Sequence, residues 1–194
     1  MAKKNGRNTK GKIIVAAWKL FYEQGYEDTT IEEIIEESGT SKGSFYHYFA
    51  GKDALLSSLS YMFDEKYEEL MEKMDEDMHS FDKLMYLNRE LFLLVENSIS
   101  IELLAKLYSS QLTTKGEKHL LDHNRVYYKV LRTIFSEGQK KGEITEELST
   151  SELVKVYALC ERALLYDWCL SNGNYSLTRY TEKMFPLFLE KFKI

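Results

Sequence analysis

A four-residue break between two short helical patterns is the feature that most restricts how this chain can fold. Upstream of the break, Thr30 and Glu33 have the spacing of a capping box, in which each side chain bonds the other residue's backbone at the start of a helix. Gly39 suits the left-handed conformation that a tight turn requires, and Ser41 can cap the helix that follows. The sequence therefore predicts a helix, a four-residue turn and a second helix.

The second helix, residues 42–49, is predicted to have an apolar inner side and a polar outer side. Phe45 and Phe49 are four residues apart, so both can face the core. The first turn exposes backbone N–H groups at the positive end of the helix dipole, which favours a phosphate. Such a helix-turn-helix places its second helix in the major groove of DNA. The side chains able to donate to phosphates or to press on sugars and thymine methyl groups are Ser41, Lys42, Ser44, Tyr46, His47 and Tyr48.

Helical periodicity extends through the rest of the chain. Apolar residues recur at three- and four-residue spacing from Thr9 to Gly25, which predicts a helix in front of the turn. Another apolar stripe predicts one continuous helix from Lys52 to about Met78, roughly 40 Å long at 1.5 Å per residue. Strand alternation, internal repeats and glycine-rich phosphate loops do not appear in the sequence, so the predicted fold class is all-α. Further helices are predicted at residues 80–96, 98–111, 117–141, 150–171 and 176–192.

The charge of the chain is unevenly distributed around a net value of -5. Residues 1–52 hold eight Lys or Arg against seven Asp or Glu, a balance of +1, so the remainder holds 18 against 24, a balance of -6. Five of the cations lie within the first twelve residues, which carry no acid. A basic head on an acidic body is compatible with nucleic acid at one end only. The basic tail taken alone fits a solvated, disordered start equally well.

The stretch from Ile13 to Leu56, with GYEDTTIEEI, GTSKGSFYHYF and GKDALL, closely resembles the DNA-binding domain of TetR-family transcriptional regulators. RALLYDWCLSNGNYSL resembles, more loosely, the C-terminal effector domain of the same family. The resemblance implies an all-α fold in which an N-terminal three-helix helix-turn-helix domain is joined by a long helix to a C-terminal helical ligand-binding and dimerisation domain. The expected domains are residues 1–52, with a basic tail at 1–8, and residues 53–194.

The resemblance also implies which residues meet DNA. In such regulators the positions of Thr29 and Thr30 touch the DNA backbone at the start of the second helix, although a plain capping role for Thr29 is as compatible with the sequence. The position of Lys52 lies on a phosphate, and Gly43 lies where the backbone approaches DNA closely. Which contacts read bases differs between family members. The recognition surface implied for this chain is Thr40, Ser41, Lys42, Ser44, Tyr46, His47 and Tyr48.

The C-terminal part indicates a second subunit. Apolar residues from Leu153 to Leu170 cover nearly the whole circumference of one helix, which must therefore be covered on two sides. One side can be the chain's own core and the other a symmetry mate. The resemblance implies a homodimer through residues of about 150–192. Because proline disrupts a helix, Pro186 is expected to bend the last helix or to lie near an irregular turn. Two recognition helices about one DNA turn apart would read a palindrome or near-palindrome.

The middle helices are expected to hold whatever the protein senses. They are rich in aromatic residues and methionine, which line small-molecule pockets and also fill cores. Arg162 and Asp167 interrupt an apolar helix and could meet a ligand, another side chain or the dimer mate. The function predicted is a repressor released from its operator by a small-molecule effector. The candidate effector-binding residues are Phe63, Tyr67, Met71, Phe92, Tyr108, Tyr127, Tyr128 and Arg162.

Other chemistries receive little support from the sequence. His119 and His123 have the i,i+4 spacing of metal ligands, with Glu117 and Asp122 nearby, but two ligands alone are weak evidence, so neither a metal nor a cofactor is predicted. Cys160 and Cys169 lie nine residues apart on one predicted helix, hence on nearly opposite faces, and are expected to be free thiols that only a dimer mate could bridge.

No catalytic arrangement of residues appears in the sequence, so the chain is not expected to be an enzyme. It has no apolar leader or run near 18 residues, and a cytoplasmic, membrane-free protein is expected. The rival interpretation is a catalytically silent helical interaction protein with a vestigial DNA-binding head. Binding to duplex DNA would separate the two.

Overall fold

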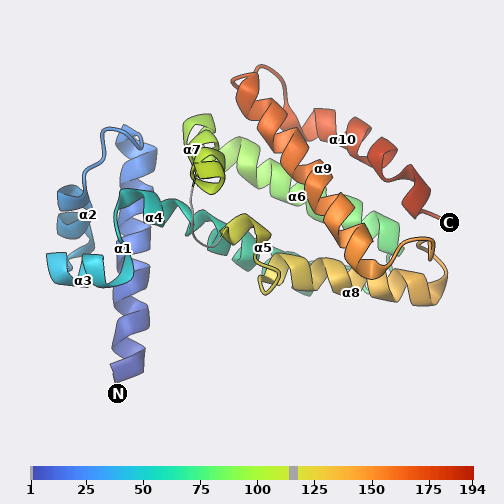
Figure 1. Cartoon of the computed structure of the whole chain (residues 1–194), viewed down its shortest axis with the longest axis horizontal. Helices are drawn as coiled ribbons and strands as arrows, with labels where there is room; N and C mark the ends of the chain where they lie inside the picture. Colours follow the sequence, from blue (N-terminus) through green and yellow to red (C-terminus); the bar gives the residue numbers. More distant parts are fainter. Residues whose placement is uncertain (1, 114–117) are drawn as a thin grey trace. The chain divides into compact units, whose positions relative to one another are not determined.

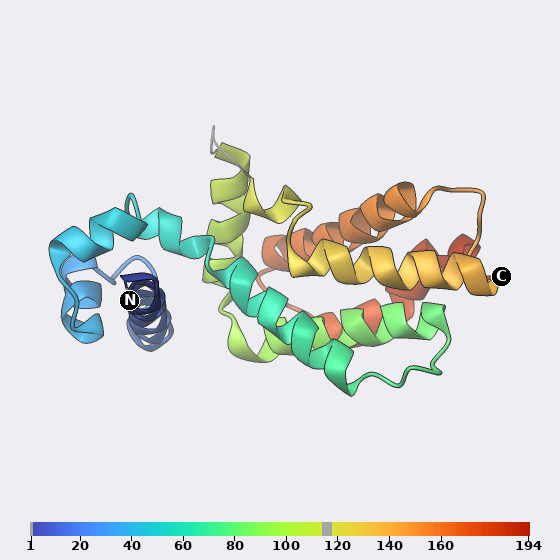
Figure 2. The same cartoon turned by 90° about the horizontal axis from the view of Figure 1, so that it is seen from below.

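The computed structural model describes residues 2–113 and 118–194, and every regular element in these ranges is helical (Figures 1 and 2). The pairing of Ile144 with Lys193 is an isolated bridge. This agrees with the predicted all-α class. The chain forms two compact units. The first unit runs to Tyr61 and includes a segment from Glu102, whereas the second comprises Met62–Ile101 and the C-terminal part to Ile194.

The first unit is built on α1 (Ala2–Gln24), against which α2 (Ile31–Ser38) and α3 (Lys42–Tyr48) pack (Figure 1). Also in this unit are α4 (Lys52–Leu56), the start of α5 (Leu59–Lys73) and nearly all of α7 (Ile101–Thr113). The core of the three-helix head contains Ile13, Ala17, Phe21, Ile34, Phe45 and Phe49. Burying these apolar side chains stabilises the head, which presents α3.

Helix α1 begins at Ala2, seven residues before the predicted start at Thr9. The prediction relied on an apolar stripe, and the leading segment AKKNGRN has none, so its helical backbone gives no periodic signal. The predicted basic tail at 1–8 is thus helical from Ala2 onward. Met1 lies outside the described residues.

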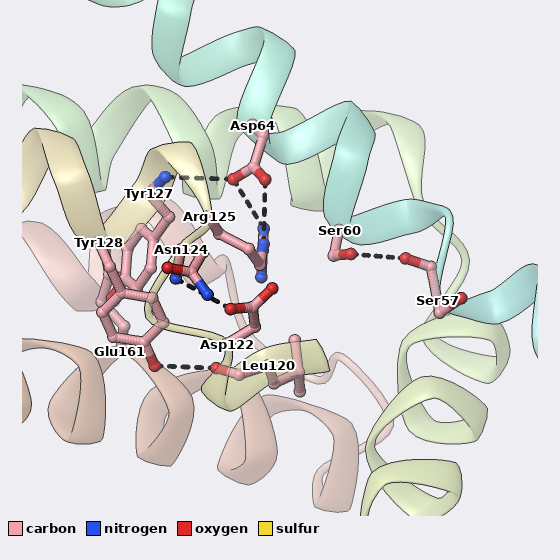
Figure 3. Close-up of polar contacts among 10 residues, drawn as sticks. All are labelled: Ser57, Ser60, Asp64, Leu120, Asp122, Asn124, Arg125, Tyr127, Tyr128 and Glu161. Carbon is pink, nitrogen blue, oxygen red and sulfur yellow. Dashed lines mark hydrogen bonds and ion pairs between the residues drawn. The ribbon is translucent and has the colours of Figure 1, made fainter. Parts of the chain in front are cut away.

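The single long helix predicted from Lys52 to Met78 is wrong. The structure has α4 and α5, separated at Ser57 and Ser58, and α5 ends at Lys73. Three serine hydroxyls donate to backbone carbonyls three residues earlier: Ser57 to Ala54 at 2.7 Å, Ser58 to Leu55 at 2.5 Å and Ser60 to Ser57 at 2.5 Å. Figure 3 shows the last of these bonds. Such back-bonding offers the backbone an alternative to the helical ladder. The pattern of apolar residues in the sequence carries no information about this competition.

The second unit contains α6 (Ser80–Ser98), α8 (Val126–Lys141), α9 (Thr150–Leu170) and α10 (Leu177–Phe188), together with α5 from Met62. Helix α9 packs on α8 and α10, and α6 packs on the same two helices (Figures 1 and 2). Gly138 of α8 marks a close approach, because a Cβ atom there would lie 2.5 Å from Ile144 Cγ1 and 2.8 Å from Ser80 Cβ. The core includes Leu84, Leu87, Phe92, Leu131, Phe135, Tyr157 and Phe185.

Two predicted helices of this unit are shorter in the structure. The helix predicted for residues 117–141 is a 3-10 turn, His119–Leu121, followed by α8 from Val126, because Asp122 accepts a bond from the Asn124 amide at 2.9 Å and forms a turn (Figure 3). Glu117 lies outside the described residues. The helix predicted for 176–192 ends at Phe188, two residues after Pro186, and a 3-10 turn, Glu190–Phe192, follows.

Candidate DNA interface and effector domain

The turn between α2 and α3 is formed by the residues that predicted it. Thr30 caps α2 in a capping box, with the Glu33 amide donating to Thr30 Oγ1 at 3.2 Å and the Thr30 amide donating to the Glu33 carboxylate at 2.7 Å. Gly39 adopts the left-handed conformation with φ of 61°. The Ser44 amide donates to Ser41 Oγ at 3.1 Å and so caps α3. The predicted helix-turn-helix is confirmed.

Helix α3 presents its polar residues to solvent. Phe45 and Phe49 are buried and anchor it to α1 and α2, whereas Lys42, Tyr46 and His47 are exposed. Ser41 and Gly43 are exposed as well, and Thr40, Ser44 and Tyr48 are half-buried. The predicted recognition residues therefore lie along α3 and the turn in front of it, and none of them is buried.

Two predicted DNA contacts differ from the expectation. Thr29 is only 1% exposed, and its hydroxyl donates to the Gly25 carbonyl at 2.7 Å, so its side chain stabilises the loop and is not available to a phosphate. Lys52 Nζ donates to the carbonyls of Tyr26, Glu27 and Thr29 at 2.6, 3.1 and 2.8 Å. Because an ammonium has three donors, Lys52 holds this loop in place instead of facing outward for a phosphate.

Helix α7 fixes the same loop from another direction. Lys106 pairs with Glu27, which lowers the pKa of that exposed carboxyl through the hydrogen bond, and the Lys106 ammonium lies 5.9 Å from the Tyr26 ring centroid. The Tyr26 hydroxyl in turn bonds to Asp53 of α4. The loop in front of α2 is thus held by residues of both α4 and α7. Sequence reasoning missed Lys106, since its partner is 79 positions away.

In the second unit, Asp64 of α5 joins that helix to the start of α8. It accepts bonds from Arg125 Nε and Nη2 at 3.0 and 2.9 Å and from the Tyr127 amide at 3.2 Å (Figure 3). Both side chains of the ion pair are 10% exposed. A bidentate pair of this kind, with a further backbone donor, is among the stronger polar contacts in proteins. The sequence contained no signal for it.

A second buried carboxyl lies deeper in the unit. Glu161 of α9 is 3% exposed and accepts bonds from Asn88 Nδ2 at 3.0 Å and from the Tyr127 hydroxyl at 2.7 Å. Burial raises the pKa of Glu161, although these donors oppose the shift. Charged groups are seldom buried without a function or a partner, so this carboxyl is a functional candidate that sequence reasoning missed.

We expect Glu161→Gln to change how stability depends on pH. Because burial raises the pKa of Glu161 above the 4.5 of an exposed carboxyl, the folded state keeps a proton that the unfolded state releases. The free energy of unfolding of the wild type should therefore fall by about 1.4 kcal/mol per pH unit above roughly pH 4.5, and should become constant above the folded-state pKa. The variant should lack this fall. Urea unfolding from pH 4 to 8 measures it, with the exposed Glu146→Gln as control; parallel curves for the wild type and Glu161→Gln would contradict the assignment.

The residues predicted to bind an effector are divided between the two units. Tyr108 belongs to the first unit, and the others belong to the second. Phe63, Tyr67, Phe92, Tyr127 and Tyr128 are buried, and the Tyr127 ring packs on Tyr67 and Tyr128 at centroid distances of 5.2 and 4.8 Å. These five act as core in this structure, which was the alternative interpretation. Met71 and Arg162 are half-buried, and Arg162 Nη1 lies 3.4 Å from the Tyr128 hydroxyl.

Two apolar stripes remain exposed on α9 and α10. On α9 the stripe is Leu159, Ala163, Tyr166 and Leu170, which recur at helical spacing. On α10 it is Tyr180, Leu187 and Phe188, together with the half-buried Met184. Leu159 is 58% and Leu187 62% exposed in the single chain. Exposed apolar stripes on adjacent helices are typical of an interface. Asp167 of α9 accepts a bond from the Tyr175 hydroxyl at 2.9 Å.

The histidine and cysteine pairs show no built site. His119 lies in the 3-10 turn and His123 beyond it, so the two do not share a face of an α-helix, and the His123 ring packs on Tyr128. Across residues 2–113 and 118–194, no group of three or more side chains could hold a metal. Burial raises the pKa of the Cys160 thiol and raises the pKa of Cys169 to about 11, so both stay protonated at neutral pH.

Comparison with known proteins agrees with this geometry. Residues 13–59 match the family described as "Bacterial regulatory proteins, tetR family", and residues 63–191 match "YsiA-like protein, C-terminal region". The second match covers more than half of the chain, and the first covers the helix-turn-helix. The chain belongs to the TetR family. It is a ligand-responsive, DNA-binding transcriptional regulator.

Several relatives cover nearly the whole of this TetR-family chain. The Fatty acid metabolism regulator protein of Bacillus subtilis (strain 168) is 24% identical over 180 residues, 91% of each chain. The crystal structure of FadR from B. subtilis with stearoyl-CoA has a TM-score of 0.71 at 22% identity and covers 94% of this chain and 99% of that one. Thermus thermophilus FadR, a TetR-family repressor solved with lauroyl-CoA, has a TM-score of 0.70 at 21% identity and covers 95% of each chain.

The matched relatives are described as transcriptional regulators. Among the helices that the structure describes, none is long and apolar enough to cross a membrane.

Proposed function

We propose that this protein is a repressor that binds a palindromic operator as a homodimer and leaves it when a small-molecule effector binds. The observation that carries the proposal is the capped helix α3, whose buried Phe45 and Phe49 turn a polar face toward solvent inside the matched DNA-binding region. A regulator of this kind acts on chromosomal DNA, so we expect it in the cytoplasm. The proposed DNA surface is Thr30, Thr40, Ser41, Lys42, Gly43, Ser44, Tyr46, His47 and Tyr48, with Thr29 and Lys52 as positioning residues.

The exposed stripes of α9 and α10 support a dimer through residues of about 150–192. A two-fold interface uses the same patch on both subunits, so two stripes per chain would form a four-helix contact. Two linked heads would then read two half-sites about one DNA turn apart, which makes the expected operator a palindrome.

Fatty acyl-CoA thioesters are the first effector class to test. The support is the similarity to the two FadR structures solved with stearoyl-CoA and lauroyl-CoA. Effector binding would reach the head through α7, which follows α6 in the chain and whose Lys106 holds the loop in front of α2. A ligand that prefers the released state about 100-fold shifts the balance by roughly 2.7 kcal/mol, which is enough for regulation.

Selection of bound duplexes from a random DNA pool at near-physiological salt tests the proposal. Wild-type protein should enrich a two-fold symmetric site, and a Lys42→Ala, Tyr46→Ala variant should enrich none. Adding stearoyl-CoA or lauroyl-CoA to the selected complex should then lower affinity. The selection should be repeated with protein that has been refolded to remove bound small molecules. If the folded, dimeric wild type enriches no site in either preparation, the rival interpretation of a vestigial head is favoured.

A pair of surface charges provides a sharper prediction. Lys42 Nζ lies 3.4 Å from Glu32, and both side chains are about two-thirds exposed, at 67% and 71%. Lys42→Met should weaken binding roughly tenfold to all sequences alike and reduce the slope of log affinity against log salt by about 1, because one phosphate contact is lost. Glu32→Gln should strengthen binding, since the carboxylate competes with phosphate for the ammonium. Fluorescence anisotropy at several KCl concentrations measures both. An unchanged salt slope in Lys42→Met would exclude a phosphate contact.

A further inference from the structure

A recess of about 210 Å³ lies between α6 and α10. Met85 and Tyr86 of α6 and Phe185 and Pro186 of α10 make its walls mainly apolar. The innermost polar residues, Asn88 and Thr181, are 3% and 0% exposed. The recess volume corresponds to roughly seven water molecules at about 30 Å³ each, so it suits a small organic group.

The polar atoms at the floor of this recess are mainly acceptors. Asn88 Nδ2 donates to the buried Glu161 carboxyl at 3.0 Å, so the Oδ1 acceptor lies on the side of the amide away from Glu161. The Thr181 hydroxyl uses its hydrogen on the Thr178 carbonyl at 3.0 Å and can otherwise only accept. Pro186 lacks the backbone N–H that would donate a helical hydrogen bond to the Glu182 carbonyl four residues earlier. This carbonyl is therefore a further acceptor on the α10 side of the recess.

An exposed ion pair also lines the recess. Arg89 Nε lies 3.2 Å from Glu182 Oε1, and the two side chains are about half exposed. The deeper residues are buried and this pair is half exposed, so the pair lies at the outer side of the recess. Exposed pairs of this kind contribute about 0–1 kcal/mol, so separation is easy. Among the described residues that line the recess, Arg89 supplies the only cation.

We propose that this recess binds the N–H donor end of a small effector with an apolar body, such as a primary amine or a secondary amide. The bond from Asn88 to the Glu161 carboxyl polarises the amide and strengthens Oδ1 as an acceptor. A carboxylate at the floor would face the Asn88 Oδ1 and Thr181 hydroxyl acceptors and is disfavoured there, because the Arg89 cation lies in the half-exposed ion pair and not at the floor. The effector role rests on the proposed function: α10 carries an exposed stripe and α6 leads into α7, so a group lodged between them acts on both helices.

Isothermal titration of the full-length protein with three probes of similar size tests the chemistry. n-Hexylamine and N-butylacetamide should bind, and hexanoate should bind at least tenfold more weakly. Glu161→Gln allows the Asn88 amide to turn over and present Nδ2, so this variant should lose most of the discrimination against hexanoate. Comparing the amine with the amide distinguishes a charged from a neutral N–H donor.

Thr181→Val should weaken binding of the preferred probe by roughly two- to tenfold, the effect of one hydrogen bond, and Thr181→Ser should restore it. Thr133→Val is the matched control, because the Thr133 hydroxyl makes the same kind of bond, to the Lys129 carbonyl at 3.1 Å, on α8. Thermal unfolding checks that each variant is folded. Equal binding of hexanoate and n-hexylamine, or equal effects of Thr181→Val and Thr133→Val, would overturn the proposal.

Operator affinity measured with and without a saturating probe separates this inference from the proposed function. Lower affinity with n-hexylamine or N-butylacetamide, abolished by Thr181→Val, supports an effector site. Probe binding with unchanged operator affinity would overturn the effector role. Protein that binds no operator at all would contradict the proposed repressor, whereas the titrations would still decide whether the recess takes an N–H donor.

Discussion

The double substitution Leu159→Glu, Leu187→Glu is expected to convert the protein into a folded monomer that binds operator DNA about 10²- to 10⁴-fold more weakly. The two leucines are 58% and 62% exposed and lie on the stripes of α9 and α10, so the single chain tolerates the change. In a dimer the same side chains would be buried, and unpaired carboxylates there would be strongly unfavourable. The loss of DNA affinity follows because the second head no longer binds as part of the same molecule.

Sedimentation equilibrium and anisotropy on the selected operator measure these two effects. The matched control is Leu121→Glu, an exposed leucine of the same unit that lies outside both stripes. It should leave the mass and the DNA affinity unchanged. A dimer that persists in the double variant would move the interface away from α9 and α10.

Asp64→Ala is expected to lower the free energy of unfolding by about 3–5 kcal/mol. The substitution leaves the Arg125 guanidinium, 10% exposed, without its carboxylate, and it removes the acceptor of the Tyr127 amide. Breaking one half of a buried pair costs more than the pair contributes, because a charge remains in a poorly solvated place. Urea unfolding at neutral pH measures the loss.

Replacing both partners, as in Asp64→Leu with Arg125→Met, should recover much of that stability, because no charge is left unpaired. The exposed pair Lys73 and Glu69, 2.5 Å apart on α5, is the control, and Lys73→Ala should cost less than about 0.5 kcal/mol. Similar losses for Asp64→Ala and Lys73→Ala would mean that the bidentate contact does not hold α5 to α8.

The head was the part of the fold most accessible to sequence reasoning. Thr30, Glu33, Gly39 and Ser41 act on backbone groups no more than a few residues away, so their spacing alone predicted the caps and the turn that the structure has. The same reasoning failed between α4 and α5. There, serine hydroxyls compete with the helical ladder, and the apolar stripe on which the prediction relied does not register that competition.

Site prediction followed the same division. Exposure of Lys42 and Tyr46 and burial of Phe45 followed from helical spacing on a capped helix. Thr29 and Lys52 differed because both bond to loop carbonyls, up to 26 positions away for Lys52. Most of the aromatic residues predicted to bind an effector are core, since aromatic composition alone does not distinguish a pocket from a packed interior.

By itself the sequence determined the helical class, the helix-turn-helix and its polar outer face, because caps, glycine turns and 3.6-residue periodicity act over one or two helical turns. The tertiary structure decided that Asp64 meets Arg125 across 61 positions, that Glu161 meets Asn88 across 73, and that Lys106 of α7 holds the loop in front of α2. Such pairs depend on how separate helices pack against one another. Spacing along a single helix carries no information about that packing.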